Sequence, residues 1–135
     1  MLVLVSSPRV IVAVSHSVKS RIRAILPHCE LRFVSAGSDL VRALDEARCD
    51  MMIVEVHFNE SSAAPALRCV LARDETFPVV CVREVQCDRP PHAALGALRM
   101  AAGVGAQAFV DLVDYPDSEA GNAGARAVLD GLLVA

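Results

Sequence analysis

Short apolar runs alternate along this chain with segments in which apolar residues recur at helical spacing. Residues 10–14 read VIVAV, a continuous β-branched run that is too short for a helix and typical of a strand covered on both faces. Apolar positions at helical spacing follow, until Pro27 ends that segment. Because the same order returns along the chain, the pattern predicts right-handed strand–helix–strand crossovers and a parallel sheet.

Five such units predict a three-layer α/β sandwich, a doubly wound parallel five-stranded sheet of the flavodoxin-like type. The expected strands are residues 10–14, 31–34, 51–56, 78–82 and 106–112. The expected helices are one between an N-cap at Ser17 and Pro27, one capped by Ser38 and Asp39, and three at 61–73, 92–102 and about 118–133. We expect one domain over residues 1–135, with residues 1–8 as an N-terminal extension or part of the first strand.

The first expected helix carries three basic residues between its apolar positions. Lys19, Arg21 and Arg23 are expected to face outward, opposite the apolar side of the helix. Lys19 is the only lysine in the chain.

Composition excludes several classes of protein. With 54% hydrophobic residues and a formal net charge of −3, the chain is neither disordered nor a binder of nucleic acid through a basic surface. One Tyr, four Phe and no Trp leave little for base stacking. The longest apolar runs fall far below the roughly 20 residues of a membrane span, and no basic segment precedes the apolar start as in a signal peptide. We therefore expect a cytoplasmic protein with no membrane partner.

The residue types that hold metals and nucleotides do not form a usable pattern. The five cysteines include no Cys-x-x-Cys pair and are expected to be buried apolar residues, and the four histidines lack ligand spacing. Residues 103–108 match the dinucleotide fingerprint in letters, but they follow a helix and open a strand, the reverse of the required context. We expect no metal and no cofactor.

Function in a doubly wound sheet is expected at the carboxyl ends of the strands, where ligands collect near the reversal of strand order. The residues at these ends are Ser15, His16, Glu55, Arg83 and Leu112.

With this order of elements the chain resembles the response-regulator receiver domain of two-component signalling, the CheY-like family, from about residue 9 to residue 133. Residues 10–26 look like the family's first strand, acidic turn and first helix. Residues 49–55, Cys-Asp-Met-Met-Ile-Val-Glu, match the pattern that leads to the phosphorylated aspartate. Residues 105–112 look like the family's Gly-Ala-x-x-(Tyr/Phe)-(apolar)-x-Lys, and residues 77–82 suit its Pro-led fourth strand.

The residues that hold magnesium in this family are replaced. The resemblance implies an acidic pair after the first strand, but that pair falls on Ser15 and His16, or on Val14 and Ser15. Mg²⁺ prefers carboxylate oxygens and waters in octahedral geometry, so neither pair makes a good site.

The remaining site positions also depart from the family. The acceptor aspartate falls on Glu55, the Ser/Thr after the fourth strand on Arg83, and the lysine after the fifth strand on Leu112. Phosphoryl transfer needs cations that stabilise the moving group. We therefore expect a pseudo-receiver that is not phosphorylated in the usual way.

Glu55 has two interpretations. It is a fixed negative charge that mimics phosphorylation, or a carboxylate that is simply paired, and the second is preferred. Because the third and fourth strands are neighbours in this fold, we predict an ion pair between Glu55 and Arg83 in place of the metal–phosphate site.

A partner surface is expected on the expected helix at 92–102, which contains almost only Ala, Leu, Gly and Met and must be buried or meet another subunit. In receivers the fourth helix, fifth strand and fifth helix form the output and dimerisation face. The switch and output residues expected there are Leu95, Leu98, Arg99, Met100 and Phe109. We expect a homodimer, or a protein partner or effector domain, through 92–102 and the last helix.

The sequence therefore predicts a signalling module that acts through protein contacts, not an enzyme. One alternative is a small enzyme or nucleotide- or ligand-binding protein on the same fold, since fold does not fix function. Another is a receiver that accepts phosphate at an unexpected residue.

Overall fold

A computed structural model of the chain describes residues 7–35, 37–55, 68, 70–72, 77–83 and 108–133. Residues 68 and 70–72 are helical and lie within the helix expected at 61–73. The helix expected at 92–102 lies outside the described residues.

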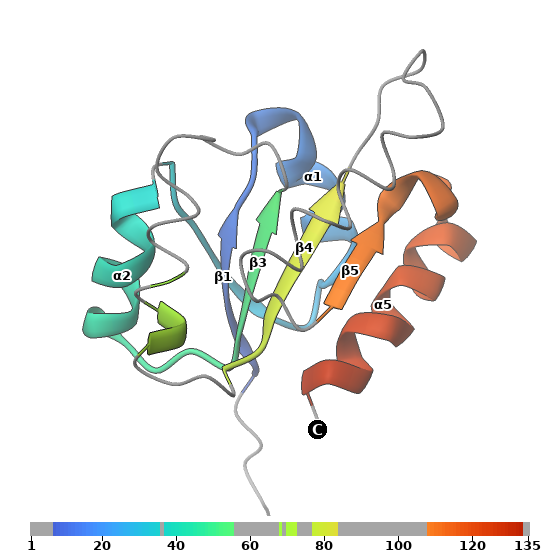
Figure 1. Cartoon of the computed structure of the whole chain (residues 1–135). Coiled ribbons are helices and arrows are strands. Elements are labelled where there is room, and N and C mark those ends of the chain that lie inside the picture. The colour runs from blue at the N-terminus through green and yellow to red at the C-terminus, as the bar shows by residue number, and fades with distance from the viewer. Residues whose placement is uncertain are drawn as a thin grey trace, which may run out of the picture.

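The sheet contains five parallel strands in the order β2-β1-β3-β4-β5 (Figure 1). The strands are β1 (Arg9–Ala13), β2 (Glu30–Phe33), β3 (Met51–Glu55), β4 (Val79–Arg83) and β5 (Ala108–Asp111). The predicted fold class is confirmed, with each strand within two residues of its expected bounds. Strand order reverses between β1 and β3, so their carboxyl ends mark the expected site.

Helix α1 (His16–Ile25) presents Val18, Ile22 and Ile25 to the sheet at intervals of three or four residues. The N-cap predicted at Ser17 is wrong, because the helix begins at His16 and Ser15 takes the extended N-cap conformation. The side chain of Ser15 caps no backbone amide; its Oγ lies 3.2 Å from that of Ser17.

Helix α2 (Gly37–Glu46) begins slightly before its predicted cap and buries Leu40 and Ala43. A short 3₁₀ turn, η1 (Leu112–Asp114), follows β5 and takes up the last residue of the strand predicted there. Helix α5 (Glu119–Leu133) starts where the sequence predicts, since the hydroxyl of Ser118 accepts a hydrogen bond from the backbone N–H of Gly121 at 3.1 Å.

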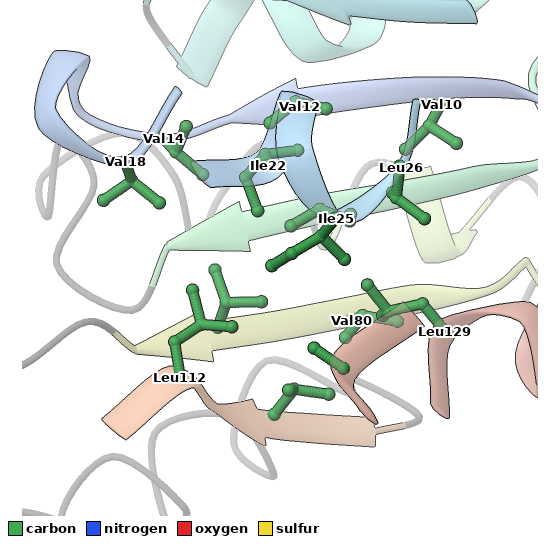
Figure 2. Packing of buried hydrophobic residues seen from close by; sticks show 14 of the residues in the cluster. Val10, Val12, Val14, Val18, Ile22, Ile25, Leu26, Val80, Leu112 and Leu129 are labelled. Atoms are coloured by element: carbon green, nitrogen blue, oxygen red, sulfur yellow. The ribbon is translucent and has the colours of Figure 1, made fainter. Parts of the chain in front are cut away.

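Both faces of the sheet carry an apolar core, as a doubly wound sheet requires. Alternate strand residues pack with α1 and α5 on one face (Figure 2). This core includes Val10, Val12, Ile53, Val80 and Val82 from the strands, with Ile22, Leu112 and Leu129 from α1, η1 and α5. The other face packs with α2; among its residues are Ile11, Ala13, Met52, Val54, Val79 and Leu40. The site residues at the strand ends are therefore carried by a rigid sheet.

The described cysteines are only partly as expected. Cys81 in β4 is 3% exposed, whereas Cys29 and Cys49 are half-buried. Burial raises the pKa of all three thiols, and that of Cys81 reaches about 11. None of the helices within the described ranges is long and apolar enough to cross a membrane.

Candidate functional site

The carboxyl ends of β1 and β3 are joined by one hydrogen bond. The backbone N–H of Ser15 donates to Oε1 of Glu55 at 2.7 Å. Ser15 is the N-cap of α1, so the carboxylate of Glu55 lies at the positive end of a ten-residue helix. Hydrogen bonds from backbone amides to a carboxylate are among the stronger ones in proteins, and this bond fixes the side chain across the reversal of strand order.

The residues that the structure describes at this point do not fit a magnesium ion. Residues 14–16 contribute no carboxylate, and one oxygen of Glu55 already accepts the amide of Ser15. Nowhere in the described part of the chain do three His, Cys, Asp or Glu side chains group in a way that could hold a metal. A hard cation that prefers several oxygen ligands is poorly served by one tethered carboxylate.

A second charged group lies at the ends of β4 and β5. Nη2 of Arg83 lies 2.6 Å from Oδ2 of Asp111, and these side chains are 9% and 12% exposed. The other carboxylate oxygen of Asp111 accepts the backbone N–H of Val113 at 3.1 Å and so caps η1. One carboxylate therefore neutralises a buried guanidinium and also shapes the turn that follows β5.

The predicted ion pair between Glu55 and Arg83 is wrong. In the sheet register Glu55 lies beside Val82, and Arg83 lies beside Asp111. Neighbouring residues of parallel strands point to the same face, and successive residues alternate. Glu55 therefore points toward the α1/α5 face with Val82, whereas Arg83 points to the opposite face and meets Asp111.

Leu112 stands where the resemblance implies a lysine, and its side chain is part of the apolar core. It is 1% exposed and belongs to the core on the α1/α5 face. Its backbone carbonyl accepts a hydrogen bond from Nη1 of Arg21 at 3.0 Å. The position therefore contributes packing and a backbone contact, and no cation.

Arg21 corrects another expectation, because it is buried and not outward-facing. Besides Leu112 it donates to the carbonyl of Tyr115 and, at 3.4 Å, to Oδ1 of Asn122. It thus connects α1 to the segment between β5 and α5. Lys19 and Arg23 lie instead over the ring of Phe33, at 5.7 and 4.7 Å from its centroid.

Two important residues, Asp111 and Arg21, were missed from the sequence. The contact of Asp111 with Arg83 can be predicted only from the register of β4 against β5, which the sequence does not give. Arg21 carried a usable signal, because it lies three residues after Val18 and four before Ile25, on the buried side of α1.

The remaining predicted site residues contribute to neither of these two groups in the described part of the chain. His16 is exposed at the first turn of α1, and Phe109 is half-buried in β5. Leu95, Leu98, Arg99 and Met100 lie outside the described residues. The structure therefore places the predicted positions in two separate groups. Ser15 contacts Glu55, and Arg83 contacts Asp111, the residue before Leu112.

Comparison with solved structures identifies the fold of the chain. No family model matches the chain, and no curated protein matches it. Among solved structures, the signal receiver domain of an HD domain-containing protein from Pseudomonas fluorescens has a TM-score of 0.72 at 12% identity, covering 99% of this chain and 92% of that one. The receiver domain of a sensor histidine kinase from Pseudomonas aeruginosa, solved with a magnesium ion in its active-site cleft, has a TM-score of 0.72 at 14% identity, covering 96% and 99%.

A response regulator from Hahella chejuensis is similar over 95% of this chain and 96% of its own, with a TM-score of 0.68 at 18% identity. The chain therefore has the fold of CheY-like receiver domains, and its structural neighbours are receiver domains.

Proposed function

We propose that this chain is a receiver-like signalling module that acts through protein contacts and without phosphorylation. The observation that carries the proposal is the hydrogen bond from Ser15 to Glu55 at the reversal of strand order. In this arrangement a permanent carboxylate takes the place of the acceptor aspartate, and a helix N-terminus stabilises it in place of a metal ion.

The chemistry of phosphoryl transfer supports the same proposal. Transfer to a carboxylate needs positive charge around the moving phosphoryl group. The nearest candidate in the sequence pattern, Arg83, is neutralised by Asp111 and points to the other face of the sheet. Leu112 offers no charge, so Glu55 has no described cation to help it accept a phosphoryl group.

The proposed partner is a protein, through β5 and α5 together with the segment at 92–102. Phe109 is half-buried, and the described part of this side exposes Val113 and Val128, at 51% and 40%. These apolar side chains support a protein contact, with a second copy of the chain or with an effector domain. Neither catalysis nor a cofactor is part of this proposal.

The test is incubation of the purified chain with acetyl phosphate and Mg²⁺, followed by intact mass measurement. We expect no stoichiometric phosphoryl adduct, because among the described residues neither a metal site nor a free cation adjoins Glu55. Glu55→Asp and Glu55→Gln variants are treated in parallel, and a receiver domain with a complete acidic pair is the positive control. A stoichiometric adduct on the unaltered chain overturns the proposal, and its loss in Glu55→Gln alone assigns the adduct to Glu55.

A further inference from the structure

We propose that this chain binds a small organic anion, a phosphate monoester or a carboxylate with a compact apolar group, between α2 and the amino ends of β1 and β2. The site is a pocket of about 200 Å³. Its lining, which we call the arginine pocket, includes Arg9, Glu30, Arg32, Ala47, Arg48 and Cys49.

The sheet supplies charged residues where a covered parallel sheet is normally apolar. In the register of β1 against β2, Arg9 lies beside Glu30 and Ile11 beside Arg32. By alternation these four side chains share the face that packs against α2, since Ile11 belongs to the core on that face. Charged side chains do not pack as closely against a helix as apolar ones. The arginine pocket lies where these charged residues of the sheet meet α2.

The lining carries more positive than negative charge. Three arginines, Arg9, Arg32 and Arg48, are among the residues that line the pocket, with one acidic residue, Glu30. Arg32 is paired outside the pocket, with Glu46 of α2. Each of the three arginines has one acidic neighbour, Glu30, Glu46 or Asp50, so an anion in the pocket gains by competing with those carboxylates for the guanidinium groups.

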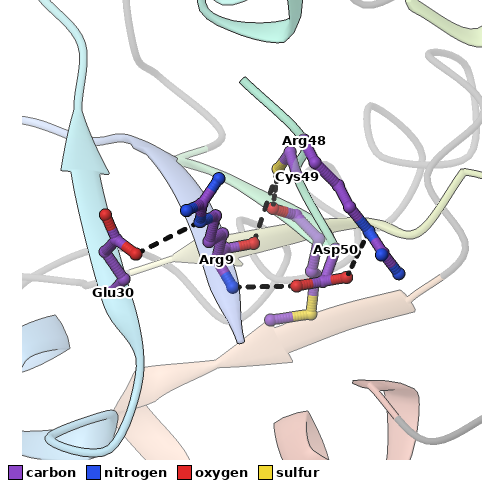
Figure 3. A network of polar contacts seen from close by, with 6 residues as sticks. Arg9, Glu30, Arg48, Cys49 and Asp50 are labelled. Carbon is purple, nitrogen blue, oxygen red and sulfur yellow. Dashed lines mark hydrogen bonds and ion pairs between the residues drawn. The ribbon is translucent and has the colours of Figure 1, made fainter. Parts of the chain in front are cut away.

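Two of the guanidinium groups are weakly engaged (Figure 3). Arg9 uses Nε for Glu30 at 3.2 Å, and both side chains are more than half exposed. Nε of Arg48 lies 3.8 Å from Oδ1 of Asp50, beyond hydrogen-bond distance, and Arg48 is 86% exposed. Exposed pairs of this kind contribute little to stability, so an oxyanion can compete for the terminal nitrogens of both arginines.

The backbone around these arginines is held firmly. Oδ2 of Asp50 accepts the backbone N–H of Arg9 at 2.9 Å, and the N–H of Asp50 donates to the carbonyl of Arg9 at 2.8 Å. The thiol of Cys49 donates to the carbonyl of Met51 at 2.9 Å. Burial raises the pKa of that thiol, so it stays neutral at pH 7 and adds no negative charge to the pocket. Such preorganisation lowers the cost of binding.

The apolar side of the pocket sets the class of ligand. Ala43 and Ala47 of α2 and the segment that follows it contribute small side chains, and Ile11 contributes the sheet side. A pocket of about 200 Å³ admits a small organic anion and excludes a dinucleotide. Because the pocket lies at the amino ends of the strands, about 13 Å along the sheet from the edge that carries Glu55, this inference does not depend on the proposed function.

The experiment is a titration of the ¹⁵N-labelled chain with phenyl phosphate and with inorganic phosphate at constant ionic strength, followed by amide chemical shifts. We expect saturable shifts at Ile11, Glu30 and Cys49, with phenyl phosphate binding more tightly than inorganic phosphate. Replacing Arg48→Gln should weaken binding about tenfold, since a hydrogen bond to a charged group contributes about 1.5–3 kcal/mol.

The matched control is Arg42→Gln, which removes the same charge from a residue of α2 outside the pocket. Arg42 is 70% exposed and lies 3.7 Å from Asp39, so its ion pair resembles that of Arg48 and Asp50. Binding should change by less than about twofold in this variant. Non-saturable shifts, shifts centred on Ser35 and Arg42, or equal losses in the two variants would each overturn the proposal.

Discussion

Arg83 and Asp111 form a nearly buried ion pair at the end of β4 and β5, and the energetics of such pairs are asymmetric. Removing charges from water costs several kcal/mol per ion, and the attraction at 2.6 Å between Nη2 and Oδ2 offsets much of that cost. Nε of Arg83 is buried without a hydrogen-bond partner, which adds to the cost of the pair. We infer that the pair determines the local geometry more than it stabilises the fold.

Replacing Asp111→Asn should lower the free energy of unfolding by about 3–5 kcal/mol, because the amide leaves the Arg83 guanidinium buried without a counter-charge. Asn keeps the shape of the side chain and an oxygen that can cap Val113, so the variant isolates the charge. Urea denaturation followed by circular dichroism measures the change.

The control for this variant is Glu46→Gln, which breaks the exposed pair with Arg32. Side chains in that pair are 43% and 49% exposed, so its loss should cost no more than about 1 kcal/mol. Similar costs for the two variants would show that burial does not set the strength of the Arg83 pair.

Helices α1 and α5 are connected by two arginines, one from each helix. Arg21 of α1 bonds carbonyls between β5 and α5, and Arg126 of α5 donates to the carbonyls of Ile25 and Ala24 at 2.6 and 3.1 Å. The contacts of Arg126 satisfy carbonyls at the end of α1 that have no partner within the helix. The two helices therefore cover their face of the sheet as one unit.

The start of α5 depends on a close backbone contact at Gly121. A Cβ built there lies 1.8 Å from the carbonyl oxygen of Pro116, which is backbone and cannot turn away. Gly131 lies near the end of the same helix, and a Cβ there has no atom within 4 Å.

Replacing Gly121→Ala should therefore destabilise the fold by about 1–3 kcal/mol through overpacking. Gly131→Ala should stabilise it by up to about 1 kcal/mol, because alanine is the better helix former. Thermal unfolding of the two variants beside the unaltered chain measures both effects. A lower melting temperature in both variants, or in neither, would show that the contact with Pro116 is not what requires glycine.

The boundaries of these elements could be predicted from the sequence where the signal is local. The run at residues 10–14 and the apolar positions of α1 and α2 placed strands and helices within a few residues, because period and turn residues act over short distances. The N-cap of α1 was misplaced from Ser15 to Ser17, since either serine satisfies the local pattern.

The five-stranded fold as a whole could be predicted, but the pairing at its site could not. The parallel sheet covered on both faces follows from the alternation of strands and helices, whereas the face on which each charged side chain lies depends on register. A shift of one residue decides whether Arg83 meets Glu55 or Asp111, and no local feature of β4 specifies that register. The arginine pocket was missed for the same reason, because Arg9, Arg32 and Arg48 come together only in the folded sheet.

Cys81 connects the stability of the whole fold to pH. It lies in the middle of β4, is 3% exposed, and desolvation by burial raises its pKa from 9.0 to about 11. In the unfolded chain the thiol releases its proton near pH 9, whereas in the native state it keeps the proton until about pH 11. The unfolded state therefore binds fewer protons in this interval, and stability must fall as the pH rises through it.

The free energy of unfolding should accordingly be unaffected by this thiol below about pH 8 and should decrease by at most about 3 kcal/mol between pH 9 and pH 11, at about 1.4 kcal/mol per pKa unit. A Cys81→Val variant keeps an apolar side chain of similar size in β4 and removes the titrating group. Urea denaturation under reducing conditions, at several pH values from neutral to alkaline, measures both proteins. Because other groups titrate equally in the two, the difference between their curves isolates Cys81. Parallel curves across this interval would mean that the native thiol ionises as readily as the unfolded one, and that β4 is open to water at its centre.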